Sequence, residues 1–456
     1  MPGTSKRDST SNSAAVGARN DGAQNDGAQN CNVALVGFGT VGSSVARILC
    51  ERSNTHLRLT HILNRNVARK KVDWLPSSVQ WTENIDDVLS SNVDVVVEVM
   101  GDLQPTEGWI RRALESGKSV VTANKQLIAR VGPELIALAR RMNQQIAFGA
   151  SVAGGVPVIS GLHEGLAGDE LFKIRGILNG TCNYILSQIE STGIPFATAL
   201  REAQKLGFAE ADPTEDIDGL DARAKLTILA RVGLHCNVSA ENISARSISA
   251  IDSVDFEYAN QLGCTIRQIS RAELRTESRA ESKTTSKGDE LFAAVQPALV
   301  ELSSPLARVE GSQNLVMATG TYGGETVFGG HGAGGHPTAV AVVSDILAIA
   351  RAKQVGMSYS GPPVEKTPTV TADFTTKHYL RFMVKDRPGI IASLATILSQ
   401  CGINIDAVVQ KPGCPKSHLP FLITLEECKA SLVEQALLQI NSLDFLVQPC
   451  LHLPIL

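Results

Sequence analysis

The first third of the chain alternates short apolar runs with segments of helical periodicity. The apolar runs that fit buried strands cover residues 32–36, 57–63, 93–99, 119–122 and 145–148. Between them, apolar positions three and four residues apart predict helices, for example at residues 43–51, 110–116 and 132–142. This alternation indicates the α/β class and predicts a doubly wound, Rossmann-type parallel sheet.

After residue 150 the pattern becomes a long mixture of extended and helical segments, which predicts an α+β region. Within it, residues 273–290 are almost wholly polar and lie between two apolar runs, so we expect an extended hairpin tip there. Residues 337–352 again have helical periodicity. Residues 358–371 are rich in proline and lack periodicity, which is typical of a linker.

The last part of the chain, residues 378–456, has the pattern of a βαββαβ module. Its strands are expected at residues 379–384, 405–410, 419–426 and 444–451, and its helices at residues 390–400 and 432–440. An Asp-Arg-Pro-Gly turn at residues 386–389 precedes the first of these helices.

Composition narrows the class of protein. The chain has 456 residues, 43% apolar content and a formal net charge of −4, so it can bury two or three cores and offers no basic patch for nucleic acid. Its nine cysteines include no Cys-x-x-Cys pair, which argues against a disulfide framework or a zinc site and favours a reducing compartment.

Two features of the chain bear on its location in the cell. Residues 1–30 are polar, contain the tandem repeat Asp-Gly-Ala-Gln-Asn and lack the apolar core of a signal peptide, so we expect a disordered tail. No apolar run reaches the roughly 18 residues that a membrane helix needs. We therefore expect a cytoplasmic protein without a membrane segment.

A glycine-rich turn follows the first predicted strand. In this Gly-x-Gly-x-x-Gly pattern the backbone can approach a pyrophosphate at the start of the next helix. A plain tight turn would explain the glycines equally well, but their place after a buried strand favours a dinucleotide site. The residues expected to contact the cofactor here are Gly37, Phe38, Gly39, Thr40, Val41 and Gly42.

The segment after the second strand bears on cofactor choice. An NAD site commonly has an acidic residue about 20 positions beyond the glycines, yet residues 57–72 contain none. Instead Arg65, Arg69, Lys70 and Lys71 cluster there. We expect NADP(H) to be preferred, with Arg65 nearest the 2′-phosphate, while NAD(H) remains usable. A solvated basic loop is the alternative.

An acidic run at residues 207–225 holds six carboxylates and ends in Lys225. Asp221 and Lys225 are four residues apart, so on a helix starting near residue 220 they lie on one face. Such a pair is most often a solvated surface pair. The surrounding segments of the sequence favour an active-site pair instead.

This acidic run and five further segments resemble homoserine dehydrogenases, in the same order. The further segments are Val-Gly-Phe-Gly-Thr-Val-Gly (36–42), Val-Val-Thr-Ala-Asn-Lys (120–125), Ser-Val-Ala-Gly-Gly-Val-Pro (151–157), Gly-Ile-Leu-Asn-Gly-Thr-Cys-Asn-Tyr-Ile-Leu (176–186) and Gly-Ala-Gly-Gly-His-Pro-Thr-Ala (332–339). The C-terminal module resembles an ACT domain. The resemblance implies the NAD(P)H-dependent interconversion of L-aspartate 4-semialdehyde and L-homoserine, in threonine, methionine and isoleucine biosynthesis.

The resemblance also implies a domain plan. Residues 31–150 and 327–352 would form the NAD(P)-binding Rossmann domain, and residues 151–326 the substrate-binding and dimerisation domain. Residues 353–375 would be a linker, and residues 376–456 the ACT domain. Because only a short tail precedes the nucleotide fold, we expect no aspartate kinase portion. A homodimer is the family default, and pairing of ACT domains would give a homotetramer.

Site roles follow from the same resemblance. Lys225 is the candidate proton donor, Asp221 would orient it or bind substrate, and Lys125 would supply a second positive charge beside the nicotinamide. Further cofactor contacts are expected from Gly101, Gly332 and Gly334. The substrate would meet Glu210 and Asp216 through its ammonium group. Its carboxylate would meet Asn179, Gly180 and Thr181, or these three residues would frame the pocket.

Three other features of the sequence suggest further chemistry. Cys182 suggests a covalent thiohemiacetal, but no base adjoins it, and a small buried cysteine is the commoner state. His331 and His336 are spaced poorly for zinc. By resemblance, the carbonyls of Val152, Gly154 and Val156 would hold a monovalent cation such as Na⁺, although a ligand position that is commonly glutamate is Gly149 here; a tight turn is the alternative.

The ACT domain is expected to bind L-threonine, through residues 386–389 and Asn404, and a purely structural module is its alternative. Two rival functions also fit the sequence. One is a non-catalytic nucleotide and amino-acid sensor, and the other is an oxidoreductase for another small amino aldehyde.

Overall fold

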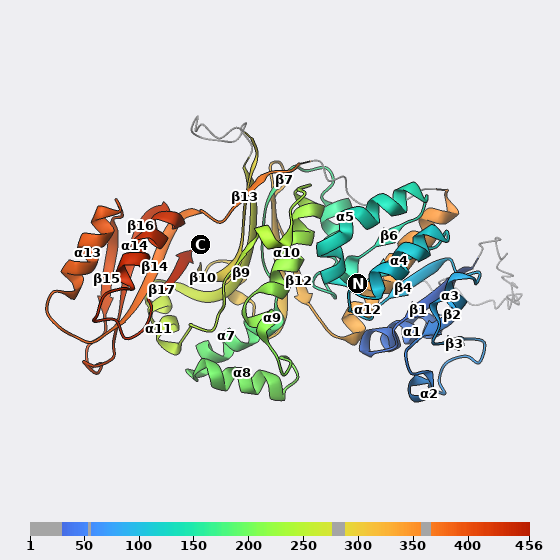
Figure 1. Ribbon diagram of the computed structural model, residues 1–456, viewed down its shortest axis with the longest axis horizontal. Coiled ribbons are helices and arrows are strands. Elements are labelled where there is room, and N and C mark those ends of the chain that lie inside the picture. Colours follow the sequence, from blue (N-terminus) through green and yellow to red (C-terminus); the bar gives the residue numbers. More distant parts are fainter. Residues whose placement is uncertain (1–29, 53–55, 276–287, 357–365) are drawn as a thin grey trace, which may run out of the picture.

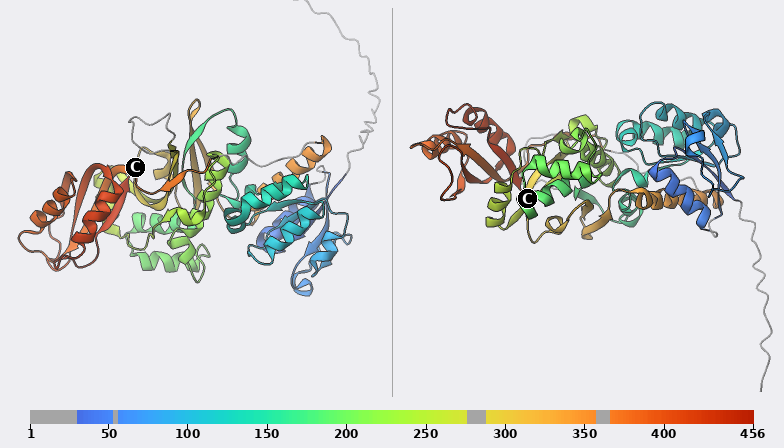
Figure 2. Two further views of the ribbon diagram at one scale, coloured as in Figure 1. Left: turned by 45° about the horizontal axis from the view of Figure 1, so that its top comes forward. Right: turned by 90° about the horizontal axis from the view of Figure 1, so that it is seen from below.

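The computed structural model describes residues 30–52, 56–275, 288–356 and 366–456. They form three domains in a row, with the N-terminal domain at one end, a larger middle domain, and a C-terminal domain at the other end (Figures 1 and 2). The expected tail, the tip of the polar hairpin and the proline-rich part of the linker fall on residues outside these ranges. No helix within the ranges is both long and apolar enough to span a bilayer.

The N-terminal domain contains six parallel strands in the order β3-β2-β1-β4-β5-β6, which is the predicted doubly wound topology. Its elements are β1 (Cys31–Val36), α1 (Thr40–Glu51), β2 (Leu57–Leu63), α2 (Val67–Lys70), β3 (Gln80–Thr82), α3 (Ile85–Leu89), β4 (Val95–Glu98), α4 (Thr106–Glu115), β5 (Ser119–Thr122), α5 (Lys125–Arg141) and β6 (Ile146–Ala147). The strands are apolar on both sides because helices cover both faces of the sheet.

One covering helix comes from far along the chain. Helix α12 (Gly335–Gln354) packs beside α1, and its apolar face, with Val342 and Ile346, completes the core on one side of the sheet. The return to the N-terminal domain thus begins after His331 rather than at residue 327. Residues 324–331 instead form a strand of the middle domain.

The middle domain joins a mixed sheet to a layer of helices. Its strands are β7 (Leu171–Ile177), β8 (Ser244–Ala245), β9 (Cys264–Arg275), β10 (Glu290–Glu301), β11 (Gln313–Gly320) and β12 (Gly324–His331). Its helices are α6 (Val158–Ser160), α7 (Gly180–Thr192), α8 (Phe196–Lys205), α9 (Thr214–Ile217), α10 (Leu220–Gly233) and α11 (Ser253–Gln261). Strands β9 and β10 pair antiparallel up to the described ends of the polar segment, so the predicted hairpin is present.

The C-terminal domain has the predicted βαββαβ order. Its elements are β14 (Thr375–Val384), α13 (Ile390–Gln400), β15 (Ile405–Gln410), β16 (Leu419–Lys429), α14 (Ala430–Ile440) and β17 (Leu451–Ile455). The prediction of the last strand at residues 444–451 was wrong. Phe445 is buried in the domain core, and the strand forms beyond it, where the chain can pair with β14.

The sheets of the middle and C-terminal domains are continuous. Strand β17 pairs with β14 on one side and with β10 on the other, which gives the strand order β12-β11-β7-β9-β10-β17-β14-β16-β15. Part of the expected linker is also ordered, since β13 (Thr369–Thr371) pairs with β10. The two domains therefore share backbone hydrogen bonds as well as side-chain packing.

Candidate active site

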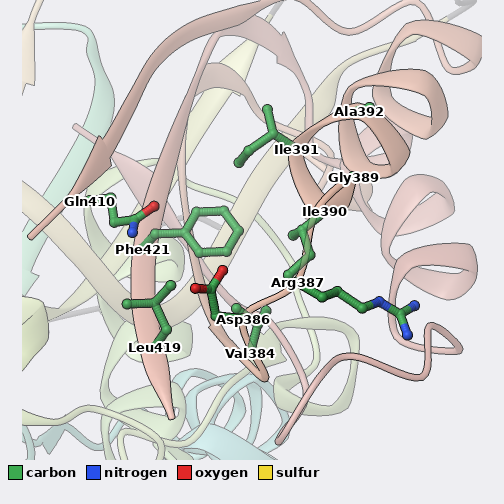
Figure 3. Close-up of a pocket in the computed structure, with 10 residues that line it drawn as sticks. All are labelled: Val384, Asp386, Arg387, Gly389, Ile390, Ile391, Ala392, Gln410, Leu419 and Phe421. Atoms are coloured by element: carbon green, nitrogen blue, oxygen red, sulfur yellow. The ribbon is translucent and has the colours of Figure 1, made fainter. Parts of the chain in front are cut away.

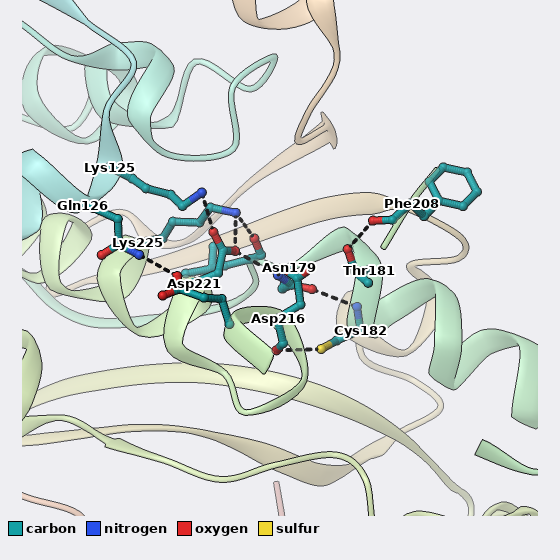
Figure 4. A network of polar contacts seen from close by, with 11 residues as sticks. Lys125, Gln126, Asn179, Thr181, Cys182, Phe208, Asp216, Asp221 and Lys225 are labelled. Carbon is teal, nitrogen blue, oxygen red and sulfur yellow. Dashed lines mark hydrogen bonds and ion pairs between the residues drawn. The ribbon is translucent and has the colours of Figure 1, made fainter. Parts of the chain in front are cut away.

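A single carboxylate links two lysines from different domains. Asp221 lies in the first turn of α10 and is 4% exposed. Its Oδ2 lies 2.7 Å from Nζ of Lys225, one turn later, and its Oδ1 lies 2.9 Å from Nζ of Lys125, the first residue of α5 (Figure 4). Lys225 also donates to the carbonyl of Leu178 at 2.8 Å. The i, i+4 pair predicted from sequence is thus an interdomain cluster.

Asn179 organises the substrate side of this cluster. Its Nδ2 donates to Asp221 Oδ2 at 2.9 Å and to Asp216 Oδ1 at 2.6 Å, while its Oδ1 accepts the N–H of Cys182 at 2.8 Å. The last contact is an N-cap of α7. One amide side chain therefore starts a helix and fixes two carboxylates.

The charges in the cluster balance through burial and pairing. Burial would raise the pKa of Asp221, but the two lysines more than offset it and hold that pKa well below its usual range. Burial lowers and Asp221 raises the pKa of Lys125, with a net rise. Burial raises the pKa of Asp216 despite the hydrogen bond from Asn179. The arrangement keeps Lys125 positively charged at neutral pH.

The remaining candidates for substrate binding lie at the start of α7 and on the acidic loop that precedes α9. Thr181, at the start of α7, donates through Oγ1 to the carbonyl of Phe208 at 2.7 Å, which ties the helix start to the acidic loop. Gly180 packs against Ser312, where a Cβ would come within 2.7 Å of its carbonyl. Glu210 lies on the same loop, and its side chain is exposed.

The surroundings of Cys182 do not suit a nucleophile. It is fully buried, its Sγ donates to the carbonyl of Asp216 at 3.0 Å, and burial raises the pKa of its thiol well above the ordinary value. The thiol form does not attack carbonyl carbons efficiently. The expectation that Cys182 is not a nucleophile agrees with this geometry.

The glycine-rich turn fits a dinucleotide pyrophosphate. Gly37 has φ of +106°, and a Cβ at Gly42 would collide with the carbonyl of Gly37, so neither position accepts another residue easily. A Cβ at Gly39 would meet nothing within 4 Å, and Gly39 starts α1 without a side-chain cap. The turn therefore presents open space and helix N–H groups to an anion.

The side chains of this turn point in different directions. Phe38 is 4% exposed and packs against Trp81 and Trp74, so it faces the core and only its backbone can face a cofactor. Thr40 is exposed and Val41 is partly buried against the core. Helix α12 approaches from the other side, where a Cβ at Gly335 would lie 3.0 Å from the carbonyl of Thr40.

The other cofactor candidates lie around this turn. Arg65 follows β2, its side chain is 86% exposed, and it lies 4.0 Å from Asp102. Gly101 follows β4 with φ of +93°. Gly334 precedes α12 with φ of +119°, and Gly332 packs so closely on Asn314 that a Cβ would collide with it.

The proposed cation segment is a tight turn braced by α12. Val156 donates its N–H to Ala153 at 2.6 Å, and its carbonyl accepts from Val158 at 2.7 Å. A Cβ at Gly154 would lie 2.6 Å from Thr338 Oγ1 of α12. At Gly149, the N–H donates to Asp345 Oδ2 at 2.8 Å, so a carboxylate from α12 lies where a side chain at 149 would begin.

The C-terminal domain holds a pocket of about 270 Å³ at the start of α13 (Figure 3). Its lining includes Asp386, Gly389, Gln410 and Phe421. Asn404 is absent from that lining and donates instead to Glu426 at 3.1 Å. Of the residues expected to bind an effector, the 386–389 turn is at the pocket and Asn404 is not.

Sequence reasoning missed several residues that lie around the Lys125–Asp221–Lys225 cluster. Glu98 and Thr122 meet below the turn that carries Lys125, and Gln126 donates to Glu215 Oε2 at 2.9 Å across the two domains. Glu98 had one visible signal, since it ends a run of three valines in a buried strand. The contact between Gln126 and Glu215 had none.

Comparison with known proteins places this site in a family. Residues 157–347 match the model for homoserine dehydrogenase, residues 37–149 its NAD binding domain, and residues 378–445 the ACT domain. The homoserine dehydrogenase of Bacillus subtilis is 38% identical over 390 residues, which are 83% of this chain and 87% of that protein.

Solved structures give the same result. A homoserine dehydrogenase from Thiobacillus denitrificans superposes with a TM-score of 0.83 and 33% identity, and the match covers 93% of this chain and 98% of that one. A hyperthermophilic archaeal homoserine dehydrogenase in complex with NADPH matches with a TM-score of 0.58 and 28% identity, over 71% and 98% of the two chains. With its nucleotide-binding, catalytic and ACT domains all matched, the chain belongs to the homoserine dehydrogenase family, whose members are NAD(P)-dependent oxidoreductases acting on CH–OH groups.

Proposed function

We propose that this chain reversibly reduces L-aspartate 4-semialdehyde to L-homoserine through the Lys125–Asp221–Lys225 cluster, with NADP(H) preferred. The observation that carries the proposal is the one buried carboxylate that binds two ammonium groups from two domains. Aldehyde reduction builds negative charge on the carbonyl oxygen, and a preorganised pair of cations stabilises such charge.

The residues divide the work of the reaction. The nicotinamide, when bound, supplies the hydride that reaches the aldehyde carbon. The electron pair of the C=O bond moves to oxygen, and Lys225 donates a proton from Nζ to complete the hydroxyl. Lys125 supplies the second positive charge near that oxygen. Asp221 orients both lysines, and in homoserine oxidation the neutral Lys225 amine takes the hydroxyl proton back.

The polar ends of the substrate have partners of the right charge. The ammonium group binds to Asp216 and Glu210. Its carboxylate binds at the start of α7, where the first N–H groups of the helix, those of Gly180 and Thr181, favour an anion, and where Asn179 lies alongside. A sensor without catalysis would need no such pair of lysines. An enzyme for another small amino aldehyde is distinguished by comparing turnover of homoserine with that of its one-carbon homologues.

Preference for NADP(H) rests on Arg65. It follows β2, the strand beside the glycine-rich turn, and Asn64 of the same loop accepts the N–H of Phe38 at 3.4 Å. An exposed guanidinium at this place suits a 2′-phosphate. The archaeal homoserine dehydrogenase solved in complex with NADPH supports this preference.

A monovalent cation binds at the carbonyls of Val152, Gly154 and Val156. The negative charge that Gly149 lacks comes from Asp345, whose carboxylate lies against the backbone of residue 149. Activity that responds to neither Na⁺ nor K⁺ would count against this site.

The ACT domain binds an amino-acid effector, and L-threonine, an end product of the branch, is the proposed one. The N–H groups at the start of α13 suit its carboxylate, and Asp386 suits its ammonium. The signal has a path: Arg381 of β14 binds Asp255 of α11 at 2.9 Å, and the core around them includes Cys182 and Ile185 of α7. Millimolar threonine should change activity or melting temperature.

Assembly as a homodimer, or as a homotetramer through paired ACT domains, completes the proposal, together with a cytoplasmic location. The assembly rests on the family resemblance. Light scattering of the purified protein gives the assembly directly.

The decisive assay is homoserine-dependent reduction of NADP and NAD by the wild type and by Lys225→Ala, with NADPH binding measured in both. Activity that is lost in the variant while NADPH still binds supports the reaction and the proton donor together. A wild type that binds NADPH but does not turn over homoserine would overturn the proposal in favour of the sensor.

A further inference from the structure

Glu98 ends strand β4 with its side chain 2% exposed, at the carboxyl edge of the sheet where the cofactor is expected. Its Oε1 accepts two backbone N–H groups, from Met100 at 2.7 Å and from Gly101 at 3.2 Å. Its Oε2 accepts the hydroxyl of Thr122 at 2.5 Å. One buried carboxylate therefore binds the loops that follow two adjacent strands.

The first of these loops lies against the glycine-rich turn. A Cβ at Gly37 would come within 3.0 Å of the side chain of Met100 and 3.1 Å of the carbonyl of Val99. The loop after β4 thus packs directly against the glycine-rich turn and supports it from one side. By accepting the N–H groups of Met100 and Gly101, Glu98 fixes the position of this loop against the glycine-rich turn.

The second loop carries Lys125. Thr122 Oγ1, besides donating to Glu98, accepts the N–H of Asn124 at 3.0 Å. Asn124 caps helix α5 through the N–H of Leu127 at 3.0 Å and donates to the carbonyl of Asp102 at 2.9 Å. Lys125 is the next residue, so its starting direction depends on this chain of hydrogen bonds.

We propose that Glu98 is a positioning residue that ties the cofactor turn to the Lys125 turn, so that cofactor and catalytic ammonium are held in one frame. This inference rests on the role of Lys125 in the proposed function. The buried carboxyl does no chemistry itself. It acts through Gly101 on one side and through Thr122 on the other.

Two variants separate the two sides. Glu98→Ala removes both, and it should weaken NADPH binding and lower kcat/KM for homoserine by about 100-fold, the cost of a misplacement near 1 Å. Thr122→Val keeps the shape of the side chain but removes the hydroxyl, and it should lower kcat while the NADPH dissociation constant stays unchanged. Glu98→Gln keeps an oxygen that accepts the two N–H groups, and its amide N–H can donate to Thr122 Oγ1, so NADPH binding and kcat should both stay close to the wild type.

Lys118→Met is the matched control for general loss of stability. Lys118 is buried at the opposite, amino edge of the same sheet and donates to the carbonyls of Ser91 and Val93 at 2.7 and 3.0 Å. Its substitution should lower the melting temperature and leave the NADPH dissociation constant and kcat per folded molecule unchanged. If Glu98→Ala behaves like Lys118→Met, the role of Glu98 is structural only and the inference is overturned.

A double-mutant cycle tests the route through Lys125. The effect of Thr122→Val on kcat should shrink in a Lys125→Ala background, since both changes act on one group. Additive effects would overturn the inference. NADPH binding by Glu98→Ala needs no turnover, so a wild type inactive on homoserine would refute the proposed function while this measurement still decides whether Glu98 holds the cofactor turn.

Discussion

Lys125 and Asp221 form an ion pair of 2.9 Å between the first turn of α5 and the first turn of α10, and so between the nucleotide-binding and substrate-binding domains. The same carboxylate binds Lys225. The three-residue cluster is therefore complete only while the two domains keep this contact.

Replacement of Asp221 by Asn should disable both lysines. Without the anion, burial lowers the pKa of Lys125, which Asp221 otherwise raises, so the alkaline limb of the pH–rate profile should move to lower pH. We expect kcat to fall by about 10²- to 10⁴-fold, the usual worth of acid–base catalysis. Asp218→Asn, on the same loop but outside the cluster, is the control. A variant with wild-type kcat and profile would contradict the assigned roles.

Arg65→Ala should change cofactor choice without harming catalysis. Loss of a charge-assisted hydrogen bond, worth about 1.5–3 kcal/mol, should reduce the NADPH to NADH ratio of kcat/KM by roughly tenfold or more. Arg69→Ala, in the same basic cluster but on α2, should leave the ratio nearly unchanged. Equal ratios in Arg65→Ala and the wild type would show that the cluster is a solvated loop.

The ion pair between Arg381 and Asp255 should dominate the stability of the joint between the middle and C-terminal domains. Both side chains are buried, and the hydroxyl of Tyr379 also donates to Asp255 at 2.7 Å. Arg381→Met leaves a buried carboxylate without its cation, which costs about 3–5 kcal/mol. Urea unfolding should show this loss, and Asp255→Asn added to Arg381→Met should restore part of it. If the free energy of unfolding of Arg381→Met equals that of the wild type, water reaches Asp255 and the ion pair is not buried in solution.

Asp345 should make stability depend on pH. Burial raises its pKa to about 7, and Glu164 adds to the rise while the N–H of Gly149 opposes it. The folded protein therefore binds a proton that the unfolded chain has released, so this group favours folding at low pH and loses that contribution as pH rises from about 4 to 7. Asp345→Asn should raise the melting temperature at pH 8, and Asp73→Asn, on the surface, should not.

The response of the melting temperature to sodium gives a second test with Asp345→Asn. A cation beside Asp345 stabilises its charged form, so NaCl should raise the melting temperature of the wild type at pH 8 more than that of Asp345→Asn. An equal response to salt in both would argue against a cation at this carboxylate.

Much of the fold was predictable because local pattern and tertiary pairing agree. Strand β2, helix α13 and strand β15 have the predicted bounds. Helix α5 was expected from residue 132. It begins instead at Lys125, because Asn124 provides the cap and a kink at Val131 accommodates Pro133.

The site was predictable in its residues but not in its connections. The spacing of Asp221 and Lys225 gave their contact directly. Asn179 meets Asp221 through packing within the middle domain, and Lys125 meets it through packing between two domains. Asp345 shows the limit most clearly. Its helix was recognised from periodicity, but nothing in that periodicity indicated a carboxylate against Gly149.

Helix α12 bears on the order in which the protein is made. The glycine-rich turn leaves the ribosome early, yet the core beneath α1 is completed only by Val342, Ile346 and Ile349, which follow the whole substrate-binding domain. The nascent nucleotide fold must therefore wait, with an uncovered apolar face, until some 180 intervening residues have been synthesised. Dinucleotide binding by ribosome-bound chains of increasing length should thus appear late and abruptly, as a marker that two domains have folded together.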